Sequence, residues 1–285
     1  MTNRIHNQDC VTGMAQLADA SADIVLADPP YNIGKDFGNK SDSMTMEEYI
    51  TWSRSWLSEA VRILKPSGTL YVYGFSEILA HVSVNLELEK RWLVWHYTNK
   101  TSPTTSFWQR THESIIVAWK DADQRIFNAD DVREPYSDTY IKNFKNKNKT
   151  RTTTKGRFGK TSTTYTVNDK GALPRDVLKV PALAGGAGMV ERWLWCTTCD
   201  DAFPNSEKEA HCDHSTFAHS TQKPYELTQK LLLAAKPLSG GLVVVPFVGS
   251  GSELAVIADL ALDYIGFEIN PEYVKLASRF LEKRK

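Results

Sequence analysis

The stretch Asp23-Ile24-Val25-Leu26-Ala27-Asp28-Pro29-Pro30-Tyr31 decides the fold and indicates where the functional site lies. Asp23–Ala27 is a short apolar run of the length typical of a buried strand. It is followed by a carboxylate, two prolines without N–H groups, and an aromatic ring. This order predicts a rigid backbone with free carbonyl groups at the carboxyl end of a strand, where open α/β sheets bind ligands.

The tetrapeptide Asp28–Tyr31 suits a planar ring that carries an amino group. The Asp28 carboxylate and the Pro29 carbonyl form a pair of hydrogen-bond acceptors, and Tyr31 adds a flat stacking surface. On these residues alone, a proline-rich turn with a capping Asp is an equally good interpretation, since short motifs match by chance.

The composition is that of a soluble globular protein. The 285 residues are 41% hydrophobic and 24% charged, with a formal net charge of zero, which predicts one large domain or a core domain with an insertion. No stretch approaches the ~18 to 20 apolar residues of a membrane helix, and the N-terminus lacks the apolar segment of a signal peptide. We therefore expect a cytoplasmic protein without membrane contact.

Strand and helix patterns alternate along the chain, which predicts an α/β fold with a doubly wound, mostly parallel sheet. A helical pattern over Thr45–Leu64 ends at the terminator Lys65-Pro66-Ser67-Gly68. We expect strands at 4–9, 23–27, 69–73, 92–97, 114–119, 241–245 and 263–268 and helices at 11–17, 45–64, 76–89, 225–235, 252–260 and 271–283.

One segment is strongly basic. The nineteen residues from Lys142 to Lys160 contain no acid and show no helix or strand periodicity. Such a segment is most often a solvated loop, but a local positive field in a neutral chain favours contact with a nucleic-acid phosphate backbone. The candidate DNA-binding residues are Lys142, Lys145, Lys147, Lys149, Arg151, Lys155, Arg157 and Lys160.

The C-terminal part has the pattern of a site for an adenosine-containing cofactor. A strand at 241–245 leads into Pro246-Phe247-Val248-Gly249-Ser250-Gly251-Ser252, and the next strand ends in Glu268. Glycines let the backbone approach a ligand, and an acid in this place accepts hydrogen bonds from ribose hydroxyls. The third glycine of the dinucleotide fingerprint is missing, so an NAD site fits poorly.

Several motifs in this order resemble the DNA amino-methyltransferases, and more narrowly their permuted β class, in which the target-amine motif precedes the cofactor motif. Asn7–Cys10 is also similar to the N-terminal segment of that class, whose acid faces the cofactor adenine. The resemblance covers residues 1 to about 120 and 219–285. It rests on Asp28-Pro29-Pro30-Tyr31, Thr221-Gln222-Lys223-Pro224, Pro246-Phe247-Val248-Gly249-Ser250-Gly251 and Gly266-Phe267-Glu268 with Asn270-Pro271-Glu272-Tyr273.

The resemblance implies a Rossmann-like, seven-stranded methyltransferase sheet and the cofactor S-adenosyl-L-methionine (SAM). It implies a catalytic domain in two parts, 1–129 and 217–285, around a target-recognition region at 130–216. The implied cofactor-binding residues are Asp9, Cys10, Asp28, Thr221, Lys223, Phe247, Gly249, Ser250, Gly251, Ser252 and Glu268.

The implied activity is methyl transfer to the N6 amino group of adenine in a specific double-stranded DNA sequence. The base is flipped out of the duplex and handled by Asp28, Pro29, Pro30 and Tyr31, with Tyr31 stacking on the ring. A bacterial, archaeal or phage source, a restriction-modification role with a cognate restriction enzyme, and a homodimer are further expectations of this resemblance.

Two alternatives remain at this stage. Cytosine-N4 methylation needs the same amine chemistry, although Asp at the first motif position favours adenine. A DNA-binding protein on a decayed methyltransferase fold is the alternative from another class, and its only support is Val245. The family usually has Asp at this place, and Val cannot accept a hydrogen bond from the cofactor amino group.

A cysteine and histidine cluster lies between the basic segment and the C-terminal motifs. The pairs Cys196-x2-Cys199 and Cys212-x-His214 have the spacing of a structural zinc site. His211 is the alternative fourth ligand. A loop of reduced thiols that happens to contain histidines would give the same pattern.

Overall fold

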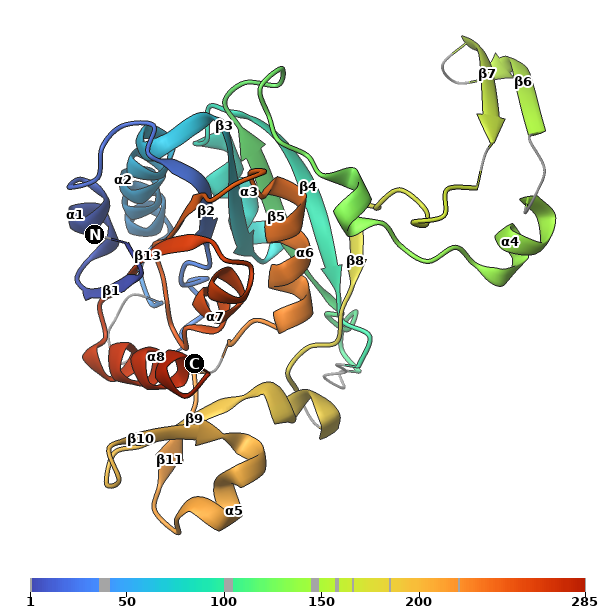
Figure 1. Ribbon diagram of the computed structural model, residues 1–285. Helices are drawn as coiled ribbons and strands as arrows, with labels where there is room; N and C mark the ends of the chain where they lie inside the picture. Colours follow the sequence, from blue (N-terminus) through green and yellow to red (C-terminus); the bar gives the residue numbers. More distant parts are fainter. Residues whose placement is uncertain are drawn as a thin grey trace. The chain divides into compact units, whose positions relative to one another are not determined.

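The computed structural model describes residues 2–284 except 36–41, 100–104, 145–148, 157–158, 166, 185 and 220. The chain divides into two compact units, residues 1–127 with 176–285 and residues 128–175 (Figure 1). The second unit is shorter than the recognition region expected at 130–216, because residues 176–216 belong to the first unit.

The first unit contains an eight-stranded sheet. Its only antiparallel pairings, within the described residues, are those of β5 with its two neighbours, so the predicted mostly parallel α/β sheet is confirmed. The predicted number of seven strands is wrong, because the short β8 pairs with β4. The strands lie in the order β1 (Arg4–Asn7), β13 (Asp263–Glu268), β12 (Leu242–Val245), β2 (Ala22–Ala27), β3 (Leu64–Gly74), β5 (His112–Trp119), β4 (Glu89–His96) and β8 (Val177–Lys179).

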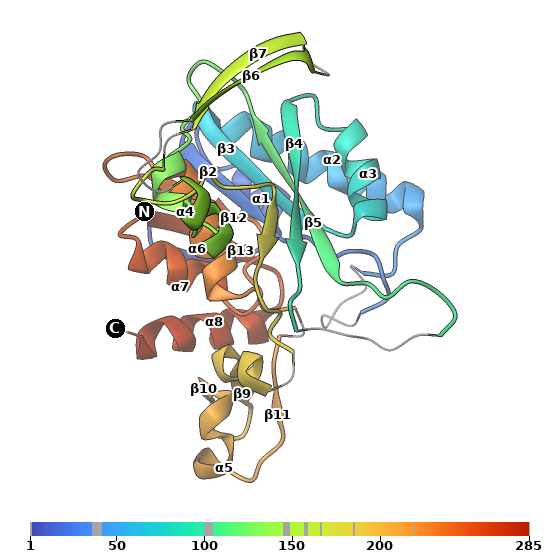
Figure 2. The same ribbon diagram turned by 90° about the vertical axis from the view of Figure 1, so that its right-hand side faces the viewer.

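Helices cover both faces of this sheet (Figures 1 and 2). One face carries α1 (Cys10–Met14), α2 (Met46–Ile63) and α3 (Ser76–Val84), and the other carries α6 (Tyr225–Ala235), α7 (Ser252–Asp259) and α8 (Pro271–Lys283). Strand β2 is buried throughout because its side chains alternate between the two layers. Ile24 and Leu26 pack toward α6 and α7, and Val25 and Ala27 pack toward α1, α2 and α3.

Helix α2 begins where the sequence predicts and ends without a turn. Thr45 and Glu48 form a capping box at its start. After Ile63 the chain passes directly into β3, so residues 65–68 are the irregular first part of a strand rather than a separate terminator. The register shifts there, from Ala22 opposite Leu64 to Ile24 opposite Thr69, as expected for a proline within a strand.

A small antiparallel sheet, β10–β9–β11, also belongs to the first unit. It packs one face on α8 through Trp195 and Ala202, which contact Tyr273 and Leu276. The opposite face has its own small cluster of Leu194, Cys196 and Phe203. The elements of this region are η2 (Gly186–Glu191), β9 (Trp193–Cys196), β10 (Asp201–Pro204), η3 (Asn205–Glu207), α5 (Lys208–His211) and β11 (Thr216–Phe217).

The second unit contains a β-hairpin where the sequence analysis found no regular structure. Strand β6 (Lys149–Gly156) pairs antiparallel with β7 (Gly159–Tyr165), and the unit also contains η1 (Ala129–Val132) and α4 (Asp138–Phe144). The missed signal is the run of threonines in both strands, because β-branched residues favour strands.

No helix in the described part of the chain is long and apolar enough to cross a membrane.

Candidate active site

A cavity of about 440 Å³ opens at the carboxyl ends of the central strands. Its position follows from the topology: β2 and β12 are neighbours, but the chain leaves them toward opposite edges of the sheet. The two connections, α2 and α7, cover opposite faces, so the loops diverge and leave a crevice at this switch point. The volume lies in the range of small-molecule sites, about 300 to 1,000 Å³.

The cavity brings together nearly all the residues that the sequence motifs suggest. Asp28, Pro29, Pro30 and Tyr31 all line it. Lys223 and Gly251 are expected cofactor residues that do not line the cavity. The expected cofactor residues that line it are Asp9, Cys10, Asp28, Thr221, Phe247, Gly249, Ser250, Ser252 and Glu268.

Lys223 is the centre of a buried polar network behind the cavity. Its side chain is 2% exposed, and its ammonium lies 2.7 Å from Asp28 Oδ2 and 3.7 Å from Glu113 Oε2. The ammonium also donates to the Tyr31 hydroxyl at 3.2 Å. That hydroxyl lies 2.8 Å from Asp28 Oδ1 and 2.9 Å from Glu113 Oε2. Tyr97 donates to the other Glu113 oxygen. The network holds the Asp28 carboxylate in one orientation.

This region groups three buried carboxyl groups near one buried ammonium. The carboxyl groups are those of Asp28, Glu113 and Glu253, and the ammonium is that of Lys223. Burial raises the pKa of Asp28, and Lys223 opposes this effect. Burial lowers the pKa of Lys223, but attraction to Asp28 and Glu113 outweighs burial and leaves it raised. Such a site favours a cationic ligand.

The two proline carbonyls differ. Tyr49 donates its hydroxyl to the Pro30 carbonyl at 2.8 Å, so the expectation that both carbonyls are free is wrong for Pro30. Within the described residues, no donor contacts the Pro29 carbonyl. Pro29 therefore keeps the acceptor that the sequence analysis assigned to it.

The loop after Tyr31 is folded around Asp42, which the sequence analysis did not single out. The Asp42 carboxylate is buried and accepts hydrogen bonds from the backbone N–H groups of Asn32, Ile33 and Lys35, at 2.5, 3.2 and 2.6 Å. Ile33 and Lys35 are thereby held on the cavity wall.

The glycine loop after β12 needs its glycines. Gly251 has φ +80°, and a Cβ atom there would lie 2.8 Å from the Cβ of Ala277 in α8. Gly249 has φ +52°, and a Cβ atom there would lie 2.8 Å from the ring of His219. These positions tolerate no larger residue without displacing their neighbours.

Glu268 ends β13 at the cavity, as predicted. Its two oxygens accept hydrogen bonds from the backbone N–H groups of Gly249 at 2.9 Å and Asn270 at 2.8 Å. Burial raises its pKa. Asp9 caps α1 through one oxygen, with Val11 N at 3.0 Å and Thr12 N at 3.1 Å. Both carboxylates retain lone pairs for a ligand.

Glu253 is a cavity residue that sequence reasoning missed. It lies in the first turn of α7, is 5% exposed and accepts a hydrogen bond from Ser252 Oγ at 2.8 Å. Val245, the departure from the usual motif, is buried at the end of β12. An acid in a first helical turn usually interacts with the helix dipole, so the sequence carries no signal that Glu253 faces the cavity.

A family model described as DNA methylase, covering N6- and N4-methyltransferases, matches residues 22–279. The chain belongs to this family. Two relatives are similar over nearly the whole chain. The type II methyltransferase M.HpaI of Haemophilus parainfluenzae is 27% identical over 99% of this chain and 75% of its own length. The DNA adenine methyltransferase YhdJ of Escherichia coli (strain K12) is 26% identical over 96% of this chain and 81% of its own length.

Solved structures share the fold of this DNA methylase. M1.HpyAVI in its complex with SAM has a TM-score of 0.57 and 16% identity, over 97% of this chain and 98% of that one. The cytosine-N4-specific PvuII DNA methyltransferase has a TM-score of 0.63 and 16% identity, over 99% of this chain and 87% of that one. The doubly wound sheet is therefore that of known methyltransferase structures.

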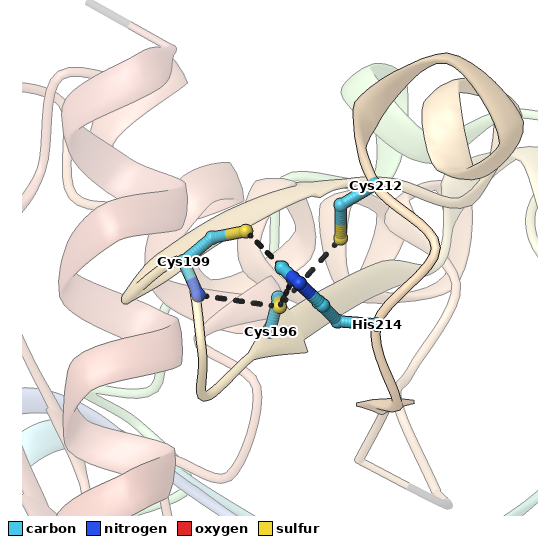
Figure 3. A group of neighbouring side chains, drawn as sticks. All are labelled: Cys196, Cys199, Cys212 and His214. Atoms are coloured by element: carbon cyan, nitrogen blue, oxygen red, sulfur yellow. Dashed lines mark hydrogen bonds between the residues drawn. The ribbon is translucent and has the colours of Figure 1, made fainter.

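The cysteine and histidine cluster of the DNA methylase lies apart from the cavity, in the small sheet (Figure 3). Cys196, Cys199, Cys212 and His214 bring their ligand atoms within 4.8 Å of one another. His211, the alternative ligand, instead stacks on Phe203 with ring centroids 3.8 Å apart and places Nε2 3.2 Å from Asp201.

The basic residues fall in the second unit. Lys142 is exposed in α4, Lys149, Arg151 and Lys155 belong to β6, and Lys160 belongs to β7. Lys145, Lys147 and Arg157 lie outside the described residues.

Proposed function

We propose that this DNA methylase transfers a methyl group from SAM to the N6 amino group of adenine in a specific double-stranded DNA sequence. One observation carries the proposal: hydrogen-bond acceptors suited to an amino group and acceptors suited to a nucleoside line the same cavity. Asp28 and Pro29 lie at one strand end, and Glu268 and the glycine loop lie at the neighbouring strand ends.

The residues fit a bound SAM. Glu268 would supply acceptors for ribose hydroxyls, Asp9 would bind the adenine, and the glycine loop would allow close backbone approach. Phe247 and Thr221 complete the wall. The three buried carboxyl groups around Lys223 leave negative charge for a cationic ligand. When bound, SAM supplies a methyl group on a positively charged sulfur. The neutral thioether that remains after transfer is a good leaving group.

Asp28 and the Pro29 carbonyl act on the target amine. The lone pair of an adenine amino group is delocalised into the ring. Two acceptors that bind both N–H groups favour a pyramidal nitrogen, whose lone pair is then available for bond formation. Since positive charge develops on that nitrogen, the Asp28 carboxylate stabilises the transition state more than the ground state.

Lys223, Tyr31 and Glu113 position Asp28. Lys223 and Tyr31 contact different oxygens of the carboxylate, at 2.7 and 2.8 Å. The Lys223 ammonium, 2.7 Å from Oδ2, opposes the burial that raises the pKa of Asp28. An ionised Asp28 accepts hydrogen bonds from the amine rather than donating them. Tyr31 also lines the cavity, and its ring is the flat surface on which a flipped base would stack.

Adenine is favoured over cytosine by two observations. Asp28 stands at the motif position where the adenine enzymes commonly have Asp. The relative YhdJ is named as an adenine methyltransferase. The fold shared with a cytosine-N4 enzyme does not discriminate, because the amine chemistry of the two reactions is the same.

The second unit is proposed to contact DNA. The eight basic residues between Lys142 and Lys160 would bind phosphates, and base readout would come from the neighbouring polar residues Asn146, Asn148 and Thr152–Thr154. A homodimer, a cognate restriction enzyme and a cytoplasmic location stay predictions.

The test combines calorimetry with SAM and methyl transfer to mixed-sequence DNA. We expect the wild-type protein to bind SAM and to methylate DNA. Asp28→Ala should abolish transfer and leave SAM binding largely intact, because Asp28 acts on the amine. Asp28→Asn keeps the side-chain volume and separates the loss of charge from the loss of packing. Near-normal turnover of Asp28→Ala would contradict the mechanism, and absence of SAM binding in the wild type would favour a decayed enzyme.

A further inference from the structure

The side chains of Cys196, Cys199, Cys212 and His214 point toward one centre (Figure 3). The sulfurs of Cys196 and Cys212 are 3.6 Å apart, and His214 Nδ1 lies 3.3 Å from Cys199 Sγ and 3.7 Å from Cys196 Sγ. A tetrahedral zinc ion with Zn–S of about 2.3 Å and Zn–N of about 2.0 Å has S···S edges of roughly 3.8 Å and S···N edges of roughly 3.5 Å. We propose that these four side chains bind one zinc ion.

The sulfur distances and the ligand types exclude a disulfide and an oxygen-preferring metal ion. A disulfide needs an S–S bond of about 2.05 Å, and all four cysteines of the chain are free. Three thiolates and an imidazole select zinc over magnesium or calcium, which prefer oxygen ligands. Because the protein fills all four positions, the ion is structural and leaves no open position for catalysis.

The face of the small sheet that carries the cluster has a small apolar core, although the other face packs on α8. On the face that carries the cluster, the buried residues are Leu194, Cys196 and Phe203. Ordering the polar segment from Cys199 to Cys212 costs conformational entropy. A structural zinc ion offsets such a cost, since the free energy of metal binding contributes to the free energy of folding.

The zinc-bound sheet also supports the segment that carries Lys223. The backbone N–H of Trp193 in β9 donates to Gln222 Oε1 at 3.2 Å, and Gln222 Nε2 donates to the Glu191 carbonyl at 2.8 Å. Gln222 directly precedes Lys223, whose ammonium holds Asp28. Loss of the metal should therefore weaken the cavity as well as the small sheet.

The experiment measures metal by elemental analysis in full-length protein purified without chelator. We expect about one zinc per chain. His214→Gln should lose most of the metal, and the matched control His211→Gln should keep it, because His211 faces Phe203 and Asp201. If His214→Gln does not fold, cobalt reconstitution of the wild type decides. The cobalt protein should show the thiolate charge-transfer and tetrahedral d–d bands.

Two outcomes would overturn the zinc site. One is less than a tenth of an equivalent of metal together with no tetrahedral cobalt spectrum. The other is equal metal content in His214→Gln and in the wild type.

A second inference concerns Glu253 and rests on the proposed use of SAM. Glu253 is buried, lines the cavity and accepts from Ser252 Oγ. Among the described residues, no cationic side chain lies within 4 Å of its carboxylate; Lys223 pairs with Asp28 and Glu113 instead. Val245, at the usual place of a cofactor-binding Asp, has no acceptor. We infer that Glu253 replaces that Asp and binds the α-ammonium group of SAM.

The test compares two ligands on the full chain by calorimetry. 5′-Methylthioadenosine shares the adenosine part of SAM and lacks the ammonium group. Glu253→Gln should weaken SAM binding about 10- to 100-fold, as expected for a lost charge-assisted hydrogen bond, and leave methylthioadenosine binding within about twofold. Glu226→Gln, an exposed acid on α6, is the control and should change neither affinity.

Equal weakening of both ligands, or no weakening of either, would overturn this role of Glu253. Failure of the wild type to bind SAM would instead contradict the proposed function.

Discussion

Glu253 has an unusual environment for a carboxyl group. Burial and the neighbouring Asp28 raise its pKa to about 7, although Lys223 acts in the opposite direction. In the unfolded chain its pKa is close to the ordinary value of 4.5. Between about pH 4.5 and 7 the folded protein therefore keeps a proton that the unfolded chain releases.

This difference predicts a pH dependence of stability in the absence of ligand. The free energy of unfolding should fall as pH rises from 5 to 8, by at most about 3 kcal/mol from this group, since one pKa unit is worth about 1.4 kcal/mol. The side chain at position 253 cannot ionise in the Glu253→Gln protein, which should therefore lose less stability over the same pH range. Asp28, Lys223 and Tyr73, which face position 253, are present in both proteins. Urea unfolding of both proteins at pH 5 and pH 8 measures the effect. Identical pH dependence in the two proteins would contradict it.

The sequence indicated the site residues that form a contiguous motif, and it did not indicate the single acids on distant elements. Asp28–Tyr31 form a motif whose chemistry can be read from neighbouring positions, and all four residues line the cavity. Glu113 and Glu253 are single acids on distant elements, and only the fold brings them to Asp28. Lys223 was assigned to the cofactor by resemblance, whereas the structure pairs it with Asp28.

The turn between β12 and α7 depends on backbone conformation and on the proximity of α8. Gly251→Asp should abolish both SAM binding and methyl transfer, because the new Cβ atom meets Ala277 and φ is +80°. Gly240→Ala is a suitable control: φ is +59° there, but no atom lies within 4 Å of the added carbon. It should cost about 1 kcal/mol of stability and leave SAM affinity unchanged. Calorimetry with SAM distinguishes the two variants, and normal affinity of Gly251→Asp would show that the turn does not form the cofactor site.

Helices and strands with a clear apolar pattern could be predicted from the sequence. Strands that form mainly because a neighbouring strand offers hydrogen bonds could not. Helix α6 and strand β13 have the predicted bounds, because each carries a clear apolar pattern between turn residues. Strand β8 has three residues and exists because β4 offers a free edge. The β6–β7 hairpin is polar, so it lacks the apolar alternation on which strand assignments rest.

If the second unit contacts DNA phosphates, as proposed, its basic residues should contribute to DNA affinity and not to sequence recognition. Lys149→Ala, Arg151→Ala and Lys155→Ala combined should weaken binding to all DNA sequences alike. Each lost phosphate contact should reduce the salt slope by roughly one unit. The methylated sequence should stay the same. DNA binding at several salt concentrations, with sequencing of the modified sites, measures both effects. An altered recognition sequence with an unchanged salt slope would show that these residues read bases.

The identity of the methylated base tests the central claim most directly. DNA modified by the wild-type protein is digested to nucleosides and analysed by mass spectrometry, with the Asp28→Ala protein as the blank. Asp28 and Pro29 both line the cavity and belong to an adenine-type motif. We therefore predict N6-methyladenine in DNA modified by the wild-type protein and none in the blank. N4-methylcytosine without N6-methyladenine would contradict the account.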